Sequence, residues 1–114
     1  MSVSFNGYQS TGLTFIAASG VTKGIPVSVS GNKTVSATAS GNGFMGFALD
    51  VREGLANVQL SGYYKASYTG TAPTAGYATL GANGSGGVKV VTTGGTKCLV
   101  LNVDTVNSTA EFIF

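Results

Sequence analysis

Turn signals built from glycine and asparagine recur about every 8–12 residues along this chain, a spacing typical of sandwiches and barrels made of short strands. The runs between these signals are rich in β-branched and aromatic residues, which favour a pleated strand. Nowhere do apolar residues recur at helical spacing for long enough to predict a helix. The sequence therefore predicts an all-β fold, a small single-domain β-barrel or sandwich. The turn signals are Gly20, Gly31-Asn32, Gly41-Asn42-Gly43, Gly54, Gly70 to Pro73, Asn83 to Gly87, Gly94-Gly95 and Asn107-Ser108.

The domain organisation follows from the length of the chain. With 114 residues, a single domain with one core buries about two thirds of the surface of its unfolded chain and needs no disulfide or metal. We expect this domain to span residues 13–114, and an N-terminal arm of mostly small polar residues to occupy residues 1–12. Alternation along the expected strands nominates as core residues Phe15, Val27, Val35, Met45, Phe47, Leu49, Val58, Leu60, Leu80, Val90, Leu99, Leu101 and Phe112.

The run GNGFMG, residues 41–46, matches the glycine fingerprint of dinucleotide-binding proteins, G-x-G-x-x-G. That fingerprint binds pyrophosphate only where it follows a strand and opens a helix. Here the odd positions from Met45 to Val51 are apolar, which predicts a strand with one apolar face. Arg52-Glu53-Gly54 then predicts a three-residue hairpin loop with Gly54 at positive φ. We therefore interpret these glycines as residues of turns and strand ends in a sheet, with no cofactor bound.

The charge content is unusually low. Only 9% of the residues are Asp, Glu, Lys or Arg, against about 25% in ordinary soluble domains. Hydroxyl groups, amides and glycine backbone must cover much of the surface, as expected where that surface meets other protein. The net charge of +2 is small and scattered along the chain, so it predicts no electrostatic footprint for nucleic acid.

The sequence offers little for catalysis or metal binding. Histidine is absent, which removes the usual general base and the commonest metal ligand. Asp50 and Glu53 flank a predicted turn while Asp104 and Glu111 lie near the end of the chain, and we interpret all four as solvated charges rather than an acid–base pair. We expect no catalytic, cofactor-binding or metal-binding residues, and no enzyme.

Cysteine usage and the N-terminal sequence bear on the compartment. Cys98 is the only cysteine and lies in the apolar run KCLVLNV, where we expect a buried thiol without a disulfide partner. The first residues lack the basic and apolar regions of a secretory signal, and no window approaches the roughly eighteen apolar residues of a membrane span. We expect a protein made and kept soluble in the cytoplasm, with no membrane partner.

Three successive stretches carry a pattern of glycines and valines. The stretch SGVTKGIPVSVSGN contains Gly-Val-x-x-Gly-x-Pro-Val, at Gly20, Val21, Gly24, Pro26 and Val27. A strand of glycine and small apolar residues follows at residues 44–48, and the next strand is marked by Gly54, Val58 and Gly62. From Gly20 to Asp104 this succession resembles the head decoration proteins of tailed bacteriophages, also called capsid cement proteins.

The resemblance implies a non-enzymatic, β-barrel-like structural protein of the virion. Such a protein is made in the host cytoplasm, binds the outer surface of an expanded capsid, often as a homo-oligomer (a trimer), and stabilises it. Its partner would be the major capsid protein. The candidate capsid-contact residues are Val3, Phe5 and Tyr8, the sizeable apolar side chains of an arm that could add to a neighbouring sheet edge. The alternatives are another virion module (neck, tail or fibre) and a carbohydrate-binding or adhesin domain.

Overall fold

The computed structural model describes residues 11–114, and this part of the chain contains ten β-strands and no helix. The predicted all-β class is confirmed. Within the same residues there is accordingly no helix that is long and apolar enough to cross a membrane. The strands are β1 (Thr11–Ala17), β2 (Pro26–Gly31), β3 (Thr34–Ala37), β4 (Gly46–Arg52), β5 (Leu55–Ser61), β6 (Tyr63–Ser67), β7 (Gly76–Ala82), β8 (Val88–Val90), β9 (Thr96–Asp104) and β10 (Thr109–Ile113).

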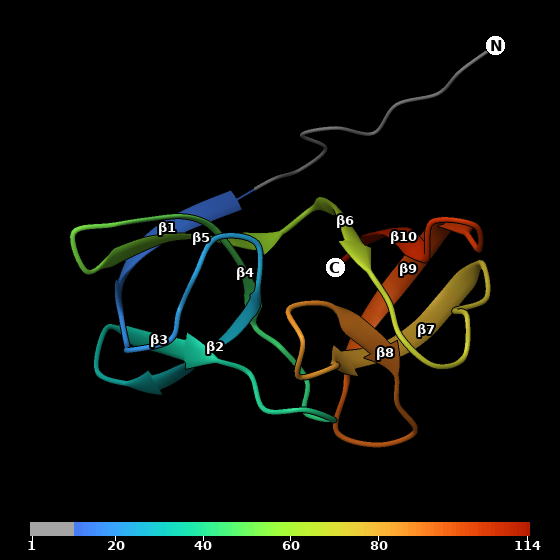
Figure 1. Cartoon of the computed structure of the whole chain (residues 1–114), viewed down its shortest axis with the longest axis horizontal. Helices are drawn as coiled ribbons and strands as arrows, with labels where there is room; N and C mark the ends of the chain where they lie inside the picture. The colour runs from blue at the N-terminus through green and yellow to red at the C-terminus, as the bar shows by residue number, and fades with distance from the viewer. Residues whose placement is uncertain (1–10) are drawn as a thin grey trace, which may run out of the picture.

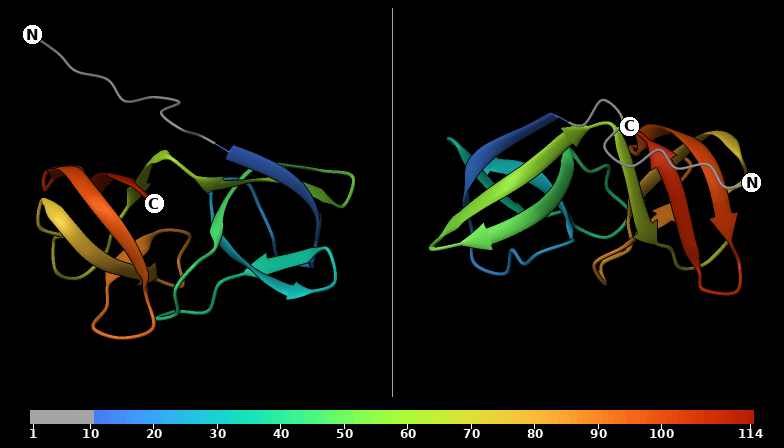
Figure 2. Two further views of the ribbon diagram at one scale, coloured as in Figure 1. Left: turned by 180° about the vertical axis from the view of Figure 1, so that it is seen from behind. Right: turned by 90° about the horizontal axis from the view of Figure 1, so that it is seen from above.

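The strands form two units that lie side by side along the long axis of the molecule (Figure 1). β1, β3, β2, β4 and β5 close into a barrel in that order, and β6, β10, β9, β7 and β8 form a five-stranded sheet. A parallel bridge between Tyr68, just after β6, and Val88 of β8 joins the two edges of this second sheet. The chain passes from the barrel to the second sheet at Gly62, where φ is 101°, and both units are distinct when viewed from behind and from above (Figure 2).

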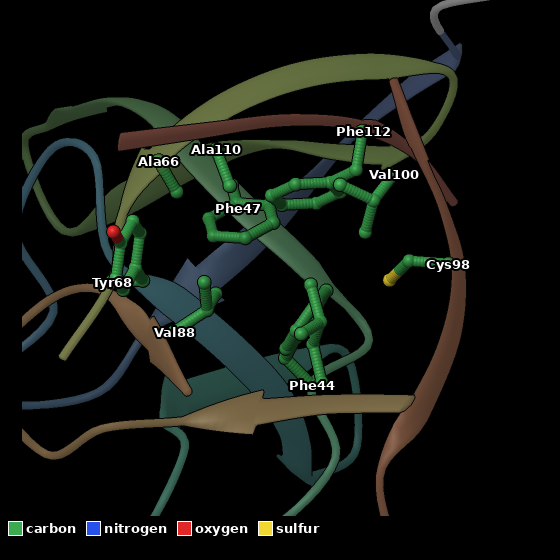
Figure 3. Packing of buried hydrophobic residues seen from close by; sticks show 10 residues of the cluster. Phe44, Phe47, Ala66, Tyr68, Val88, Cys98, Val100, Ala110 and Phe112 are labelled. Carbon is green, nitrogen blue, oxygen red and sulfur yellow. The ribbon is translucent and has the colours of Figure 1, made fainter. Parts of the chain in front are cut away.

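Buried apolar side chains form two clusters, where the sequence predicted one core. The barrel cluster lies inside the barrel and contains Val21, Val27, Val35, Ala48, Ala56 and Val58. The aromatic cluster lies between β4 and the second sheet (Figure 3) and contains Phe44, Phe47, Ala66, Tyr68, Leu80, Val88, Cys98, Val100, Ala110 and Phe112. Sequence length alone could not reveal the division, because it depends on one strand that is buried on both faces.

That strand is β4. Phe47 packs in the aromatic cluster and its neighbour Ala48 packs in the barrel cluster, so successive side chains of the strand serve different cores. A register shift between Ala48 and Asp50 makes Leu49 the extra residue of a bulge against β5. Beyond the bulge the faces exchange, and Val51 packs against the barrel cluster. The prediction of one apolar face from Met45 to Val51 is therefore wrong.

Leu49, at the bulge, is half-buried, and the other nominated core residues fall into three groups. Val27, Val35, Phe47, Val58, Leu80 and Phe112 are fully buried, and Phe15, Met45 and Leu60 are partly buried against the barrel cluster. The remaining three nominees of the second sheet were wrongly placed: Val90 is 40% exposed, and Leu99 and Leu101 are half-buried. In β9 the interior positions belong to Cys98 and Val100. Every side chain from Cys98 to Leu101 is apolar, so alternation could not tell the two faces apart.

The hairpin between β4 and β5 is tighter than predicted. Arg52 pairs with Leu55, so the loop holds only two residues, Glu53 at φ 52° and Gly54 at φ 78°. Positive φ at both positions is the signature of a type I′ turn, whose twist matches that of the flanking strands. The three-residue loop was wrong, whereas the positive φ at Gly54 is confirmed.

The GNGFMG run is where the two units meet. A Cβ on Gly43 would lie 2.8 Å from the carbonyl oxygen of Gly94, in the loop between β8 and β9. A Cβ on Gly46 would collide with the backbone of Gln59. The amide of Gly41 donates to the carbonyl of Ala82 (2.8 Å). β4, not a helix, follows the run. These glycines allow close approach of backbones, which confirms their interpretation as structural residues.

The boundary of the N-terminal arm also needs comment. β1 begins at Thr11, which pairs with Ser61 of β5, so the last two residues of the arm expected over 1–12 belong to a strand. Pro26 opens β2, a position where its missing N–H removes no internal ladder bond.

Candidate binding surface

The carboxylates of the described chain are separated on the surface. Asp50 and Glu53 are exposed beside the β4–β5 turn, where Asp50 pairs with Arg52 at 3.4 Å. Asp104 accepts hydrogen bonds from the amides of Val106 and Asn107 in the β9–β10 turn. Among residues 11–114, no group of three or more His, Cys, Asp or Glu side chains could hold a metal ion.

Glu111 belongs to a polar network on the outer face of the second sheet. The hydroxyl of Tyr63 and the side-chain amide of Asn102 both donate to its carboxylate. These bonds lower the pKa of Glu111, while burial, together with the bond to the carboxylate, raises the pKa of Tyr63 to about 12. Both groups keep their ordinary charge states near neutral pH, so the network holds the sheet face in place and offers no proton for transfer.

Cys98 occupies a place where it cannot act as a nucleophile. Its side chain lies in the aromatic cluster (Figure 3) and is 1% exposed, and burial raises the pKa of its thiol to about 12. A buried, protonated thiol is unreactive.

Two hollows on the surface formed by residues 11–114 are candidate ligand sites. One, of about 220 Å³, lies between the barrel and the β7–β8 loop and is lined by Gly20, Thr22, Ile25, Pro26, Ala37, Thr38, Ala82, Gly84 and Gly86. The other, of about 250 Å³, is an open depression beside the β4–β5 turn that includes Asp50, Arg52 and Glu53. The first has no titratable side chain, and its one buried polar side chain, Thr38, already shares a hydrogen bond with Ser28 (2.7 Å). The second has only exposed titratable side chains, so neither gathers the convergent polar groups of a small-molecule site.

The predicted contact residues Val3, Phe5 and Tyr8 lie outside the described residues. What the structure does bring together is an apolar row across the outer face of the second sheet. Pairing sets Tyr77 of β7 beside Leu99 of β9, Leu99 beside Ile113 of β10, and Ile113 beside Tyr63 of β6. We call these four side chains, at one level of four neighbouring strands, the Tyr77 row.

The Tyr77 row is partly accessible and has charged neighbours on both sides. Lys97 precedes Leu99 by two residues in β9. Lys65 and Glu111, which are cross-strand partners, follow Tyr63 and precede Ile113 by two residues on the same face. Tyr77 is 73% exposed, and the other three members are half-buried. The ammonium of Lys97 lies 4.8 Å from the centre of the Tyr77 ring, close enough for a cation–π contact. Adjacent apolar and aromatic side chains surrounded by polar and charged groups are typical of a protein-binding surface.

Sequence analysis missed this row because its members come from strands that are not neighbours in the chain. Leu99 was assigned to the core, and Tyr77 was not singled out. The signal in the sequence was the apolar run KCLVLNV. A strand with apolar residues on both faces has one apolar face that does not pack in the core when only one side of the sheet is covered.

Comparison with known proteins does not add a relative. No protein-family model matches the chain, and no curated protein shows a significant sequence match to it.

Proposed function

We propose that this chain is a structural virion protein that binds the outer surface of an expanded phage capsid and stabilises it. The partner in this proposal is the major capsid protein, and the place of action is the capsid surface of the virion, after synthesis in the host cytoplasm. The chain acts there as a homo-oligomer, a trimer, and has no enzymatic step. It binds neither nucleic acid nor a membrane.

The observation that carries the proposal is the Tyr77 row on a chain with so little charge. A decoration protein must hold a large protein surface through many weak contacts, and the row supplies four adjacent apolar or aromatic side chains on the outer face of the second sheet. With 9% charged residues, hydrogen bonds from hydroxyls and backbone would complete the interface. The glycine and valine pattern from Gly20 to Asp104 adds the resemblance to decoration proteins.

Tyr77 also keeps one alternative open. A tyrosine ring that is 73% exposed could stack on a sugar, as in carbohydrate-binding domains. Such domains usually combine several exposed aromatic rings with convergent polar groups in a depression. Tyr63, the other aromatic residue of the row, is half-buried, and its hydroxyl donates a hydrogen bond to Glu111. Its ring is therefore poorly placed to stack on a sugar, and the capsid proposal explains this face better.

The experiment is co-sedimentation of the purified protein with purified expanded heads of the phage that encodes it. We expect Tyr77→Ser to weaken binding at least tenfold, because the exposed ring would be buried at the interface, where aromatic side chains contribute disproportionately. The matched control is Val106→Ser, which removes an apolar side chain that is 90% exposed in the β9–β10 turn, outside the row. This variant should bind as the unchanged protein does.

Salt distinguishes the apolar mechanism from an electrostatic one. Surface charges are screened beyond about 3 Å in 1 M salt, so binding through the row should persist there. Release of most of the protein by moderate salt would overturn the apolar contact. Failure to sediment with heads at any salt concentration would overturn the proposed function itself.

A further inference from the structure

Among residues 11–114, two asparagines are followed by glycine, Asn42 and Asn83. An asparagine in such a pair can lose its side-chain amide without an enzyme, when the backbone nitrogen of the next residue attacks Cγ. Glycine favours this attack because it has no Cβ to block the approach. The fold then decides whether each pair reacts, through the freedom of the glycine nitrogen and the placement of the asparagine side chain.

The pair Asn83-Gly84 lies in the loop between β7 and β8. The amides of Ser85 and Gly87 both donate to Oδ1 of Asn83, at 2.7 and 3.0 Å. The bond from Ser85 closes an Asx turn, which folds the asparagine side chain back over the peptide that follows it. Cγ is thereby held towards the nitrogen of Gly84, the atom that would attack it.

The same two amides favour the reaction electrostatically. They point at the oxygen on which negative charge develops as the nitrogen adds to Cγ, as the donors of an oxyanion hole do. Within residues 11–114, neither Nδ2 of Asn83, the leaving group, nor the amide of Gly84 has a hydrogen-bond partner. Gly84 is exposed, so water and hydroxide reach its amide.

The pair Asn42-Gly43 is held in place where the two units meet. The amide of Gly43 donates to the carbonyl of Gly94 (2.8 Å), so its nitrogen is already engaged. The carbonyl of Asn42 accepts a hydrogen bond from the amide of Ala82 (2.9 Å), which fixes the peptide from its other side. Attack by the Gly43 nitrogen on the asparagine side chain would break a contact between the units.

We propose that Asn83 is a site of spontaneous deamidation and that the fold protects Asn42 from the same reaction. The Gly84 nitrogen gives its proton to hydroxide and bonds to Cγ of Asn83. The bond from Cγ to Nδ2 then breaks, and ammonia leaves with a proton from water. Water opens the resulting five-membered imide at either carbonyl, which yields aspartate or isoaspartate. One water is consumed and one ammonia released, without an oxidant or reductant.

The two products affect the loop differently. Both add one negative charge to a chain whose net charge is +2. The aspartate form keeps a side-chain oxygen for the amides of Ser85 and Gly87. Isoaspartate lengthens the backbone by one carbon where space is short, since a Cβ on Gly84 would lie 3.1 Å from Cβ of Ser40. The isoaspartate form therefore loosens the β7–β8 loop.

The test is peptide mapping by mass spectrometry of the full folded chain after incubation at mildly alkaline pH. The matched control is the same incubation in urea, where the fold no longer distinguishes the two pairs. Asn83→Asp supplies the aspartate product as a standard, so that the isoaspartate product can be recognised by its separate elution.

We expect the ratio of the deamidation rates, Asn83 to Asn42, to be about tenfold higher in the folded protein than in urea, because folding positions only the Asn83 side chain for attack. An equal or lower ratio in the folded protein would overturn the proposal. A folded chain that stays unmodified at Asn83 while the unfolded chain reacts would overturn it as well.

Discussion

Phe47→Ala is the substitution that most directly tests how the two units are held together. Phe47 belongs to β4 of the barrel, yet its side chain is fully buried in the aromatic cluster of the second sheet. Its ring stacks on Tyr64 with centroids 4.0 Å apart and meets Phe44 at 4.8 Å. Phe114 and Phe112 lie at 5.5 and 5.9 Å. Truncation removes all four ring contacts at once.

The magnitude follows from these contacts. Truncation of a buried phenylalanine to alanine costs about 3–5 kcal/mol of unfolding free energy, and aromatic pairs add about 0.5–1.5 kcal/mol beyond the buried area. We therefore expect the upper end of the range, about 5 kcal/mol. A domain of this size is stable by about 5–15 kcal/mol, so the loss is a third or more of the total. The melting temperature should fall by roughly 15–20 °C.

The assay is urea unfolding, followed by circular dichroism and by tyrosine fluorescence. Tyr77→Ala is the matched control, because it removes an exposed aromatic ring and should change the unfolding free energy by less than about 1 kcal/mol. The two probes should report one transition, since Phe47 and Ala48 tie both clusters to one strand. A loss below about 2 kcal/mol for Phe47→Ala, or separate transitions for the two probes, would show that Phe47 does not hold the two units together.

Three further predictions concern single groups and the N-terminal segment. A thiol reagent at pH 8 should leave Cys98 unmodified until denaturant is added, because burial raises its pKa to about 12; rapid reaction in native buffer would contradict this. The pKa of Glu111 is lower in the folded protein than its ordinary value of 4.5. The ionised carboxylate therefore stabilises the fold fully above pH 4.5, and this stabilisation is lost as the pH falls through the folded-state pKa. Melting temperature measured from pH 2 to 8 should therefore drop on the acid side, less steeply in Glu111→Gln, and an equal drop in both proteins would count against the network. A variant that lacks residues 1–10 should melt nearly as the full chain does, because both clusters lie within residues 11–114, while its occupancy on expanded heads falls; unfolding of the variant would show that the segment is needed by the barrel itself.

The sequence predicted the strand content well because its signals are local. Turn residues such as Gly54 and Asn83 to Gly87 lie between strands as expected, and Pro26 opens a strand. The β-rich run of residues 56–68 is interrupted only at Gly62, which has a positive φ and lies between β5 of the barrel and β6 of the second sheet. Positive φ is easily adopted by glycine but is not required by it, so this break could not be predicted from the residue alone.

What could not be predicted depends on contacts between distant strands. The bulge at Leu49 reverses the faces of β4, and only its pairing with β5 reveals it. The Tyr77 row needs the order β6, β10, β9, β7, in which β6 and β7 are neighbours in the chain but lie three strands apart in the sheet. The low charge content predicts a protein-binding surface, whereas the candidate position of that surface, the Tyr77 row, emerges only from the sheet order.

Decoration of the outside of an expanded capsid can be seen by cryo-electron microscopy of purified expanded heads that are incubated with the protein and reconstructed with icosahedral symmetry. We predict added density on the outer surface at symmetry-related positions, large enough for the barrel and the second sheet, with the Tyr77 row against the shell. Bare shells at saturating protein, or density confined to the neck or tail, would contradict the proposed function.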